Sequence, residues 1–329
     1  MGLHLPGRQD HPPRRVRRLA LRRSGLRAGH VVKVGVVPVN TGGYLAPGFL
    51  GRFSRLLEEL GYESVWTFEH VIIPDDYDSV YPYNPKGKLT VSGSDRFVDP
   101  LIALSWAAAT TERLRLGTGV NILTQVNPLY LAKQASSIDH LSGGRLMLGL
   151  GVGWLKEEFD ALGVPFEDRG ARADEYIDAM RAAWTGETVE LRGRFVDWHG
   201  WKMQPTPAQQ ASGPDGGGRP GVPVVVGGTS AAAIRRVVAR GDGWYVIHRD
   251  LEHFAELMGK LRAECERQGR DPASLELTAY WNHGREGLDG ARAYEDAGVS
   301  RLLVNAHALR MGDPETAVRR FADEVLSKL

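Results

Sequence analysis

The 329-residue chain is poor in cysteine and contains only Cys265. A single thiol excludes an internal disulfide and a zinc site built on several cysteines. Cys265 lies in the segment LRAECERQG, which has a helical pattern, so we expect an unreactive thiol. No metal site is predicted.

Long apolar runs are also missing, because none approaches the ~18 residues that a membrane-spanning helix needs. Charged residues make up 25% of the chain and hydrophobic residues 42%, which is ordinary for a soluble globular protein. We therefore expect a cytoplasmic protein that has neither a membrane nor a nucleic acid as its partner.

Acidic residues are scarce in the first thirty positions, which contain one acidic residue, Asp10, and many arginines between Arg14 and Arg27. Such a composition buries too little apolar surface to offset the entropy of ordering, so residues 1–30 are predicted to form a disordered basic arm. A nucleic-acid tail, a transit peptide and an extension without a folded role remain open for this arm. Charges interrupt its apolar stretch, which argues against export. Residues 31–329 are the predicted folded domain.

Two nucleotide-binding signatures are absent. The dinucleotide fingerprint G-x-G-x-x-G should follow the first strand of a doubly wound fold. The segments GLGVGW and GTGVNI carry Trp154 and Ile122 where the third glycine would stand, and both lie far from the first strand. A Walker loop is missing as well. A doubly wound dinucleotide-binding fold is therefore disfavoured.

From Val31 onward, short β-branched or apolar runs alternate with amphipathic runs such as residues 48–60, a predicted helix that ends at Gly61. The predicted strands are residues 31–39, 63–70, 113–123, 144–153, 222–228, 243–247, 275–280 and 301–306. About eight strands separated by helices are the repeat of a (β/α)8 TIM barrel, an α/β fold.

Two segments break this rhythm. Residues 71–97 are rich in proline, tyrosine and aspartate and follow the second strand, where a barrel carries active-site loops. Residues 187–221 contain a hairpin-like piece followed by a Gly/Pro-rich stretch. We predict that the first is a lid and that the second is a surface insertion before the fifth strand.

The C-terminal ends of the strands should carry the chemistry of a barrel. Glycines alternate at positions 149, 151 and 153, beside the predicted strand end Gly117-Thr118-Gly119. Missing side chains let a flat ring or another backbone approach closely, although tight packing on a helix or a bulged corner would also explain them. Trp154 follows directly and would form a flat wall.

The segment GGTS at residues 227–230 joins a strand to an alanine-rich helix. Backbone N–H groups and hydroxyls at a helix N-terminus favour phosphate, while Ser or Thr there is also an ordinary helix cap. A phosphate site beside an open flat wall indicates a phosphorylated, flavin-like cofactor.

His70 stands at the end of the second strand, and an imidazole can hold or transfer a proton near neutral pH. A hydrogen-bonded structural histidine is the alternative. His140 has the pattern of a helix-end residue, and His283 follows the seventh strand and is a weaker candidate for the cleft.

Three stretches then carry a family resemblance: ELGYESVWTFEHVIIP, the run from RLRLGTGVNIL to GVPFEDRG, and VPVVVGGTSAAAIRRVVARGDGW. In this order they resemble the luciferase-like monooxygenase superfamily, and within it the branch that uses the deazaflavin coenzyme F420. The resemblance covers most of residues 31–247. Beyond that point it depends mainly on the barrel pattern.

This resemblance implies a barrel that binds F420, or alternatively FMN, at its C-terminal mouth, with a non-prolyl cis peptide at Gly119-Val120. His70 corresponds to the histidine near the reactive ring carbon, as proton donor or charge stabiliser. Trp154 stands where sugar-phosphate dehydrogenases of the branch have glutamate, which argues against such a substrate. The implied cofactor-binding residues are Thr118, Gly119, Val120, Asn121, Gly151, Gly153, Gly227, Gly228, Thr229 and Ser230.

The leading hypothesis is F420-dependent hydride transfer to or from a small organic substrate. Trp154, Tyr77 and Tyr81 are the predicted substrate pocket, since aromatic side chains suit a moderately apolar molecule. The alternatives are an FMN-dependent monooxygenase supplied by a partner reductase, a lyase or isomerase, and a flavin-binding barrel without catalysis. The family resemblance also implies a homodimer.

Overall fold

A computed structural model describes residues 32–209, 219, 221–306 and 313–329. The predicted basic arm lies outside the described residues. The strands are β1 (Lys33–Val37), β2 (Ser64–Thr67), β3 (Arg115–Thr118), β4 (Asn121–Ile122), β5 (Leu146–Gly151), β6 (Val189–Arg192), β7 (Asp197–Trp201), β8 (Val224–Gly227), β9 (Gly243–Val246), β10 (Glu276–Tyr280) and β11 (Arg301–Asn305).

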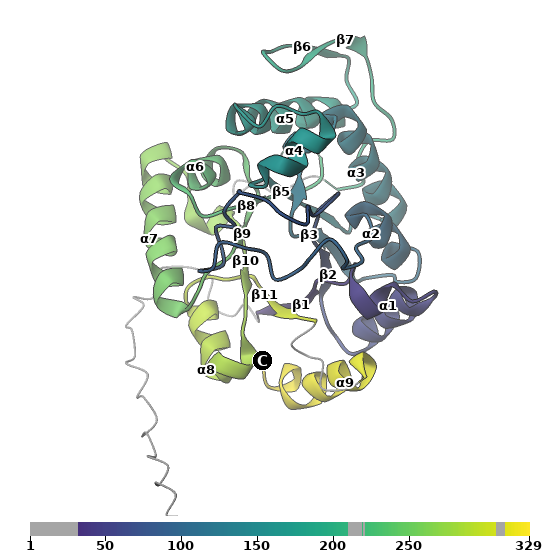
Figure 1. Ribbon diagram of the computed structural model, residues 1–329, viewed down its shortest axis with the longest axis vertical. Helices are drawn as coiled ribbons and strands as arrows, with labels where there is room; N and C mark the ends of the chain where they lie inside the picture. The colour runs from purple at the N-terminus through teal and green to yellow at the C-terminus, as the bar shows by residue number, and fades with distance from the viewer. Residues whose placement is uncertain (1–31, 210–218, 220, 307–312) are drawn as a thin grey trace, which may run out of the picture.

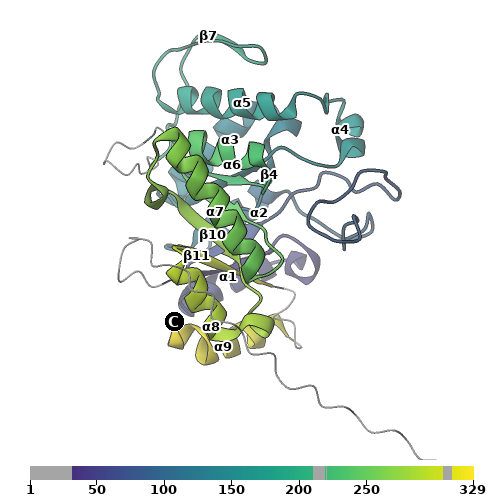
Figure 2. The same cartoon turned by 90° about the vertical axis from the view of Figure 1, so that its left-hand side faces the viewer.

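The helices surround all of these strands except β6 and β7 (Figures 1 and 2). They are α1 (Phe49–Glu59), α2 (Pro100–Ala108), α3 (Pro128–Ser142), α4 (Lys156–Leu162), α5 (Arg169–Trp184), α6 (Ala231–Arg240), α7 (Leu251–Gln268), α8 (His283–Asp296) and α9 (Pro314–Glu324), with short 3-10 turns η1 (Gly42–Leu45), η2 (Leu123–Gln125), η3 (Pro272–Ser274) and η4 (Leu326–Lys328).

The predicted TIM barrel is confirmed. A nine-stranded sheet runs in the order β3-β2-β1-β11-β10-β9-β8-β5-β4, and an additional parallel pairing of β3 with β5 closes it. The short β4 continues β3 along the chain, and the two together occupy one strand position. The closed barrel therefore has the eight strand positions that the sequence pattern predicts. Each predicted strand has a counterpart in this sheet.

One predicted strand is wrong in its extent. Residues 113–123 were expected to form a single strand, but β3 ends at Thr118 and β4 begins at Asn121. β3 pairs with β2 as far as Thr118, whereas Asn121 and Ile122 pair with β5. The Gly119–Val120 bond between them is cis, as the family resemblance implied.

Barrel strands such as β1, β2 and β8 are buried on both sides, as their β-branched composition predicts for a parallel sheet covered by helices. Inside the barrel lies a separate apolar cluster of side chains from six strands: Val37, Trp66, Met147, Val225, Tyr245 and Leu303. Val120, Ile247 and Tyr280 pack on this cluster and remain partly accessible. They follow or end strands, so they form the floor of the C-terminal mouth.

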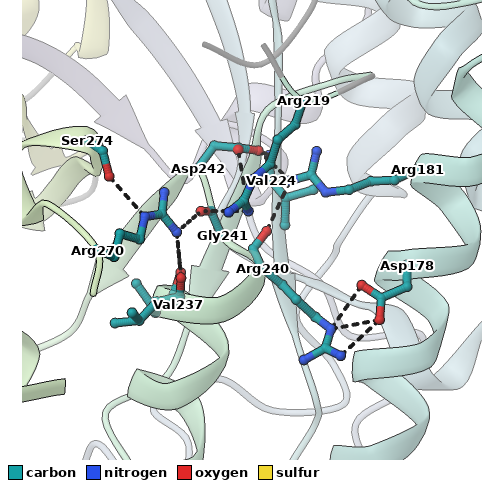
Figure 3. A network of polar contacts seen from close by, with 11 residues as sticks. Asp178, Arg181, Arg219, Val224, Val237, Arg240, Gly241, Asp242, Arg270 and Ser274 are labelled. Carbon is teal, nitrogen blue, oxygen red and sulfur yellow. Dashed lines mark hydrogen bonds and ion pairs between the residues drawn. The ribbon is translucent and has the colours of Figure 1, made fainter. Parts of the chain in front are cut away.

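Ion pairs close the other end of the barrel, at the N-terminal ends of its strands. Inside the barrel at this end, the fully buried Arg301 bonds Glu63 at 2.6 Å and Glu276 at 3.1 Å. Between β8, β9 and the helices, Asp242 accepts from Arg181 and from the Val224 N–H (Figure 3). Both groups lie at the N-terminal ends of strands, where TIM barrels carry residues for stability.

The two irregular segments behave as predicted in position. β6 and β7 form an antiparallel hairpin that stands beyond α5 in both views. Residues 71–97 contain no helix or strand apart from an isolated bridge between Phe97 and Thr41. In Figure 1 this dark blue segment crosses in front of the barrel strands. Its role as a lid stays a prediction.

Among the described helices, none combines the length and the apolar character that crossing a bilayer would require.

Candidate active site

His70 is held at the mouth by a buried carboxylate. Its Nδ1 lies 3.1 Å from Oε2 of Glu158, a residue of α4, and the two side chains are 7% and 1% exposed. A carboxylate only accepts hydrogen bonds, so Nδ1 carries the proton of this contact and Nε2 is the ring nitrogen left for other chemistry.

Glu158 also accepts hydrogen bonds from three further donors. Gln125 donates to Oε2 at 3.1 Å, and the N–H groups of Val71 and Ile72 donate to Oε1 at 2.6 and 3.3 Å. Burial raises the pKa of Glu158, but the hydrogen bonds from His70, Gln125 and Val71 outweigh it and leave the pKa below its usual value. Glu158 is therefore an anion at neutral pH.

The predicted pocket residues meet around Trp154. The Trp154 ring centroid lies 6.0 Å from that of His70, 5.7 Å from Tyr77 and 5.1 Å from Tyr81. Edge-to-face and tilted contacts of this kind are the favoured geometry of aromatic pairs. The tyrosines come from residues 71–97, so the structure joins this segment to the strand end that carries Trp154.

The space beside Gly149 and Gly151 of β5, and beside Gly153 just after it, is already filled. A Cβ at Gly149 would lie 1.7 Å from the Thr118 carbonyl oxygen, and one at Gly151 would lie 2.6 Å from Val120 Cγ2. At Gly153, whose φ is +76°, a Cβ would lie 2.5 Å from the Phe159 ring. The expectation that these glycines directly clear room for a flat ring is therefore wrong, and the close approach of another backbone is the explanation at Gly149.

Asn121 lies beside a second buried carboxyl. It donates from Nδ2 to Glu69 at 3.0 Å, and the Ile122 N–H also donates to Glu69. Burial raises the pKa of Glu69 to about 7, against the Ile122 hydrogen bond, and Asp99 and Glu158 raise it further. Among the described residues, the buried Oδ1 of Asn121 has no hydrogen-bond partner.

The residues of the predicted phosphate site lie between the end of β8 and the start of α6. Ser230 caps the helix by accepting from the Ala233 N–H at 3.1 Å, so the capping alternative holds for this hydroxyl. Gly228 has a φ of +102°, a backbone conformation that glycine adopts readily. Tyr83 of the 71–97 segment hydrogen-bonds the Thr229 side chain. Coenzyme contacts at Gly227, Gly228, Thr229 and Ser230 stay predictions.

Four phenols influence one another electrostatically: Tyr81 and Tyr83 of the 71–97 segment, Tyr245 of β9 and Tyr280 of β10. Burial raises the pKa of each of them, to about 12 for Tyr83 and Tyr280. Tyr81 lies close enough to raise the pKa of the other three. All four are therefore neutral at physiological pH, and the mouth is polar without phenolate charge.

Several of these residues escaped the sequence reasoning. Glu158 and Gln125 carry no recognisable motif for histidine binding, although Glu158 lies four residues after Trp154 in a predicted helix. Gln125 contacts Glu158, and Glu158 reaches His70 from a position 88 residues further along the chain. The ring of His283, the weaker histidine candidate, packs against Trp281 and against Phe321 of α9. His140 lies in the last turn of α3, as predicted.

In the part of the chain that the structure describes, no group of three or more His, Cys, Asp or Glu residues could hold a metal ion.

The sequence profile of the family described as "luciferase-like monooxygenase" matches residues 30–283. An uncharacterized protein of Mycobacterium tuberculosis is 31% identical over 284 residues, which cover 84% of this chain and 94% of the relative.

Two further relatives have named activities. The 5,10-methylenetetrahydromethanopterin reductase of Methanolobus tindarius is 26% identical over 279 residues, covering 85% of this chain and 72% of the reductase. The FMNH(2)-dependent dimethylsulfone monooxygenase of Pseudomonas putida is 28% identical over 221 residues, covering 66% of this chain and 54% of the monooxygenase.

Among solved structures, the coenzyme F420-dependent tetrahydromethanopterin reductase from Methanopyrus kandleri superposes with a TM-score of 0.68 at 17% identity. The superposition covers 92% of this chain and 99% of that one. At this identity the likeness supports the barrel fold.

Proposed function

Because this chain belongs to the luciferase-like monooxygenase family, whose members are oxidoreductases, we propose that it is an F420-dependent oxidoreductase acting on a small organic substrate. The observation that carries the proposal is the imidazole of His70, fixed through Nδ1 by Glu158 and placed against Trp154 at the barrel mouth. The more extensively aligned of the two named relatives is a reductase, which favours hydride transfer over oxygen chemistry.

The residues at the mouth fit a deazaflavin in two respects. Asn121 offers a buried carbonyl oxygen without a partner among the described residues, which suits a ring N–H donor. The first turn of α6 and the Gly228 backbone offer N–H groups that suit a phosphate. A bound deazaflavin supplies or accepts a hydride, and the protein supplies binding, orientation and electrostatics.

The chain's own residues have separate tasks in this proposal. Trp154, Tyr77 and Tyr81 cover the reacting region and exclude water. His70 holds or delivers a proton at Nε2, since Glu158 occupies Nδ1. Val120 supports the bound ring from the barrel floor, where it packs on the interior cluster.

The test is a separate titration of the purified protein with F420 and with FMN, followed by absorbance and fluorescence. We expect saturable F420 binding and F420-dependent turnover of small neutral alcohols, aldehydes or ketones. His70→Gln should lower turnover by about 10²–10⁴-fold, the range for loss of a general acid or base. His140→Gln, at an exposed helix end, is the matched control and should change nothing.

The second candidate function is an FMN-dependent monooxygenase that receives reduced flavin from a reductase, and the Pseudomonas putida relative supports it. Preferential FMN binding with oxygen consumption would establish this candidate and overturn the first. Coenzyme binding without any effect of His70→Gln would instead indicate a binding protein without catalysis.

A further inference from the structure

We propose that Glu158 is a positioning residue that ties the orientation of His70 to the closure of the segment 71–97. The inference builds on the proposed function, because His70 is the proton-transferring group there. It adds that the same carboxylate controls both the histidine and the segment that covers the mouth.

Four hydrogen-bond donors converge on the Glu158 carboxylate. His70 and Gln125 donate to Oε2, and the N–H groups of Val71 and Ile72 donate to Oε1. Both carboxylate oxygens therefore accept hydrogen bonds. A carboxylate can do this with both of its oxygens, whereas an amide has only one acceptor oxygen. A glutamine at position 158 would turn its NH2 group toward one donor pair, so it could satisfy the histidine side or the backbone side but not both.

The backbone donors belong to the beginning of the covering segment. Val71 directly follows His70, so the carboxylate holds the ring of one residue and the amide of the next. When the segment opens, the Val71 and Ile72 N–H groups must leave Oε1. The His70 ring then loses the backbone geometry that aims Nδ1 at Oε2.

The neighbouring Glu157 holds the middle of the same segment. Its Oε1 accepts from the N–H groups of Asp78 and Ser79 at 2.8 and 3.1 Å, and the Ser79 hydroxyl accepts from the Lys156 N–H at 3.0 Å. Two adjacent carboxylates at the start of α4 thus accept hydrogen bonds from the segment at two places. Of the two, only Glu158 also bonds His70, so variants of Glu158 and Glu157 form a matched pair.

The first experiment uses the protein without coenzyme. Amide hydrogen exchange is measured along residues 71–80, and 15N NMR reports which ring nitrogen of His70 carries the proton. In Glu158→Gln we expect exchange at Val71 and Ile72 to accelerate at least tenfold and the Nδ1–H signature of His70 to weaken. Glu157→Gln should accelerate exchange at Asp78 and Ser79 and leave the His70 signature in place.

Two further variants complete the design. His70→Phe should also accelerate exchange at Val71 and Ile72, because coupling between two sites is reciprocal. This variant keeps the proposal testable if Glu158→Gln does not fold. Asp160→Asn removes an exposed carboxylate of α4 that bonds Lys156, and it should leave every readout unchanged.

The kinetic readout separates positioning from simple structural support. With F420 and a turned-over substrate, Glu158→Gln should lower kcat by about 10–100-fold, as loss of an orienting partner does, with KM changed less than threefold. Glu157→Gln should raise KM and change kcat less than twofold. Unaltered exchange and an unaltered His70 signature in Glu158→Gln would overturn the inference, and this result is independent of whether F420 binds.

Discussion

Val120 fills the space that a side chain at Gly151 would need. A Cβ at Gly151 would lie 2.6 Å from Val120 Cγ2, and a Cβ at Gly227 would lie 2.9 Å from Val120 Cγ1. Glycines of two neighbouring strands, β5 and β8, thus make room for one valine on the barrel floor.

This arrangement predicts that Gly151→Ala and Gly227→Ala displace Val120 and disturb the floor of the proposed coenzyme site. We expect the Kd for coenzyme to rise about tenfold and the free energy of unfolding to fall by about 1–3 kcal/mol, as overpacking does. Titration and urea unfolding measure the two effects. Gly259→Ala in α7 is the control, because a Cβ there meets nothing within 4 Å, and it should stabilise the protein slightly. The same coenzyme Kd and the same free energy of unfolding in all three variants would contradict the conclusion that Gly151 and Gly227 make room for Val120 at the proposed coenzyme site.

Glu69 predicts a pH dependence of stability. Its pKa is raised from 4.5 to about 7 by burial, so the folded protein favours the neutral carboxyl. The stability from this group is fully present below pH 4.5 and is lost as the pH rises through about 7. By linkage the loss amounts to roughly 3 kcal/mol. Urea unfolding at pH 5 and pH 8 should show a larger decrease for the wild type than for Glu69→Gln, whose side chain does not titrate. Parallel curves would refute this prediction.

Arg301 predicts a large loss of stability on truncation. Its guanidinium is fully buried and bonds Glu63 and Glu276, so Arg301→Met leaves two partly buried carboxylates without their cationic partner. We expect a loss of about 3–5 kcal/mol, measured by urea unfolding. The double variant Arg301→Met with Glu63→Gln should recover part of it. A single variant as stable as the wild type would show that the ion pairs do not hold this face of the barrel.

The outer face of α2 and α3 predicts self-association. Ile102 and Trp106 of α2 are 63% and 57% exposed, Tyr130 of α3 is 74% exposed, and α2 has no charged residue. A helix that is apolar on all sides is normally buried, so we expect a second copy of the chain to cover this face. Light scattering after gel filtration should give a dimer for the wild type and a monomer for Trp106→Glu. Leu162→Glu, on α4, should remain dimeric.

Much of the fold could be predicted because the strands are apolar runs bounded by turns. The run at residues 222–228, for example, became β8, and the Ser230 pattern correctly placed a helix cap. The third strand was drawn too long, since apolar periodicity continues through Gly119-Val120 although the pairing with β2 ends at Thr118 and β4 pairs only with β5. Period and composition do not report which neighbour a strand pairs with.

The candidate site was predictable only where its residues stand at strand ends. His70 and Trp154 were selected in this way, because a parallel barrel gathers those ends at one mouth, and the structure places their ring centroids 6.0 Å apart. Glu158 was missed, since its contact with His70 joins residues 88 positions apart and depends on how α4 meets the strand ends. The function of the alternate glycines was also misjudged, because the sequence shows that side chains are absent but not what fills their place.

The sequence by itself determined the barrel, the family and the strand ends that carry the candidate site, because each depends on local pattern and chain order. Only the tertiary structure decided which carboxylate holds His70 and why β5 carries glycines. Those answers depend on the packing of distant segments against one another, and a linear pattern does not encode such contacts until the chain has folded.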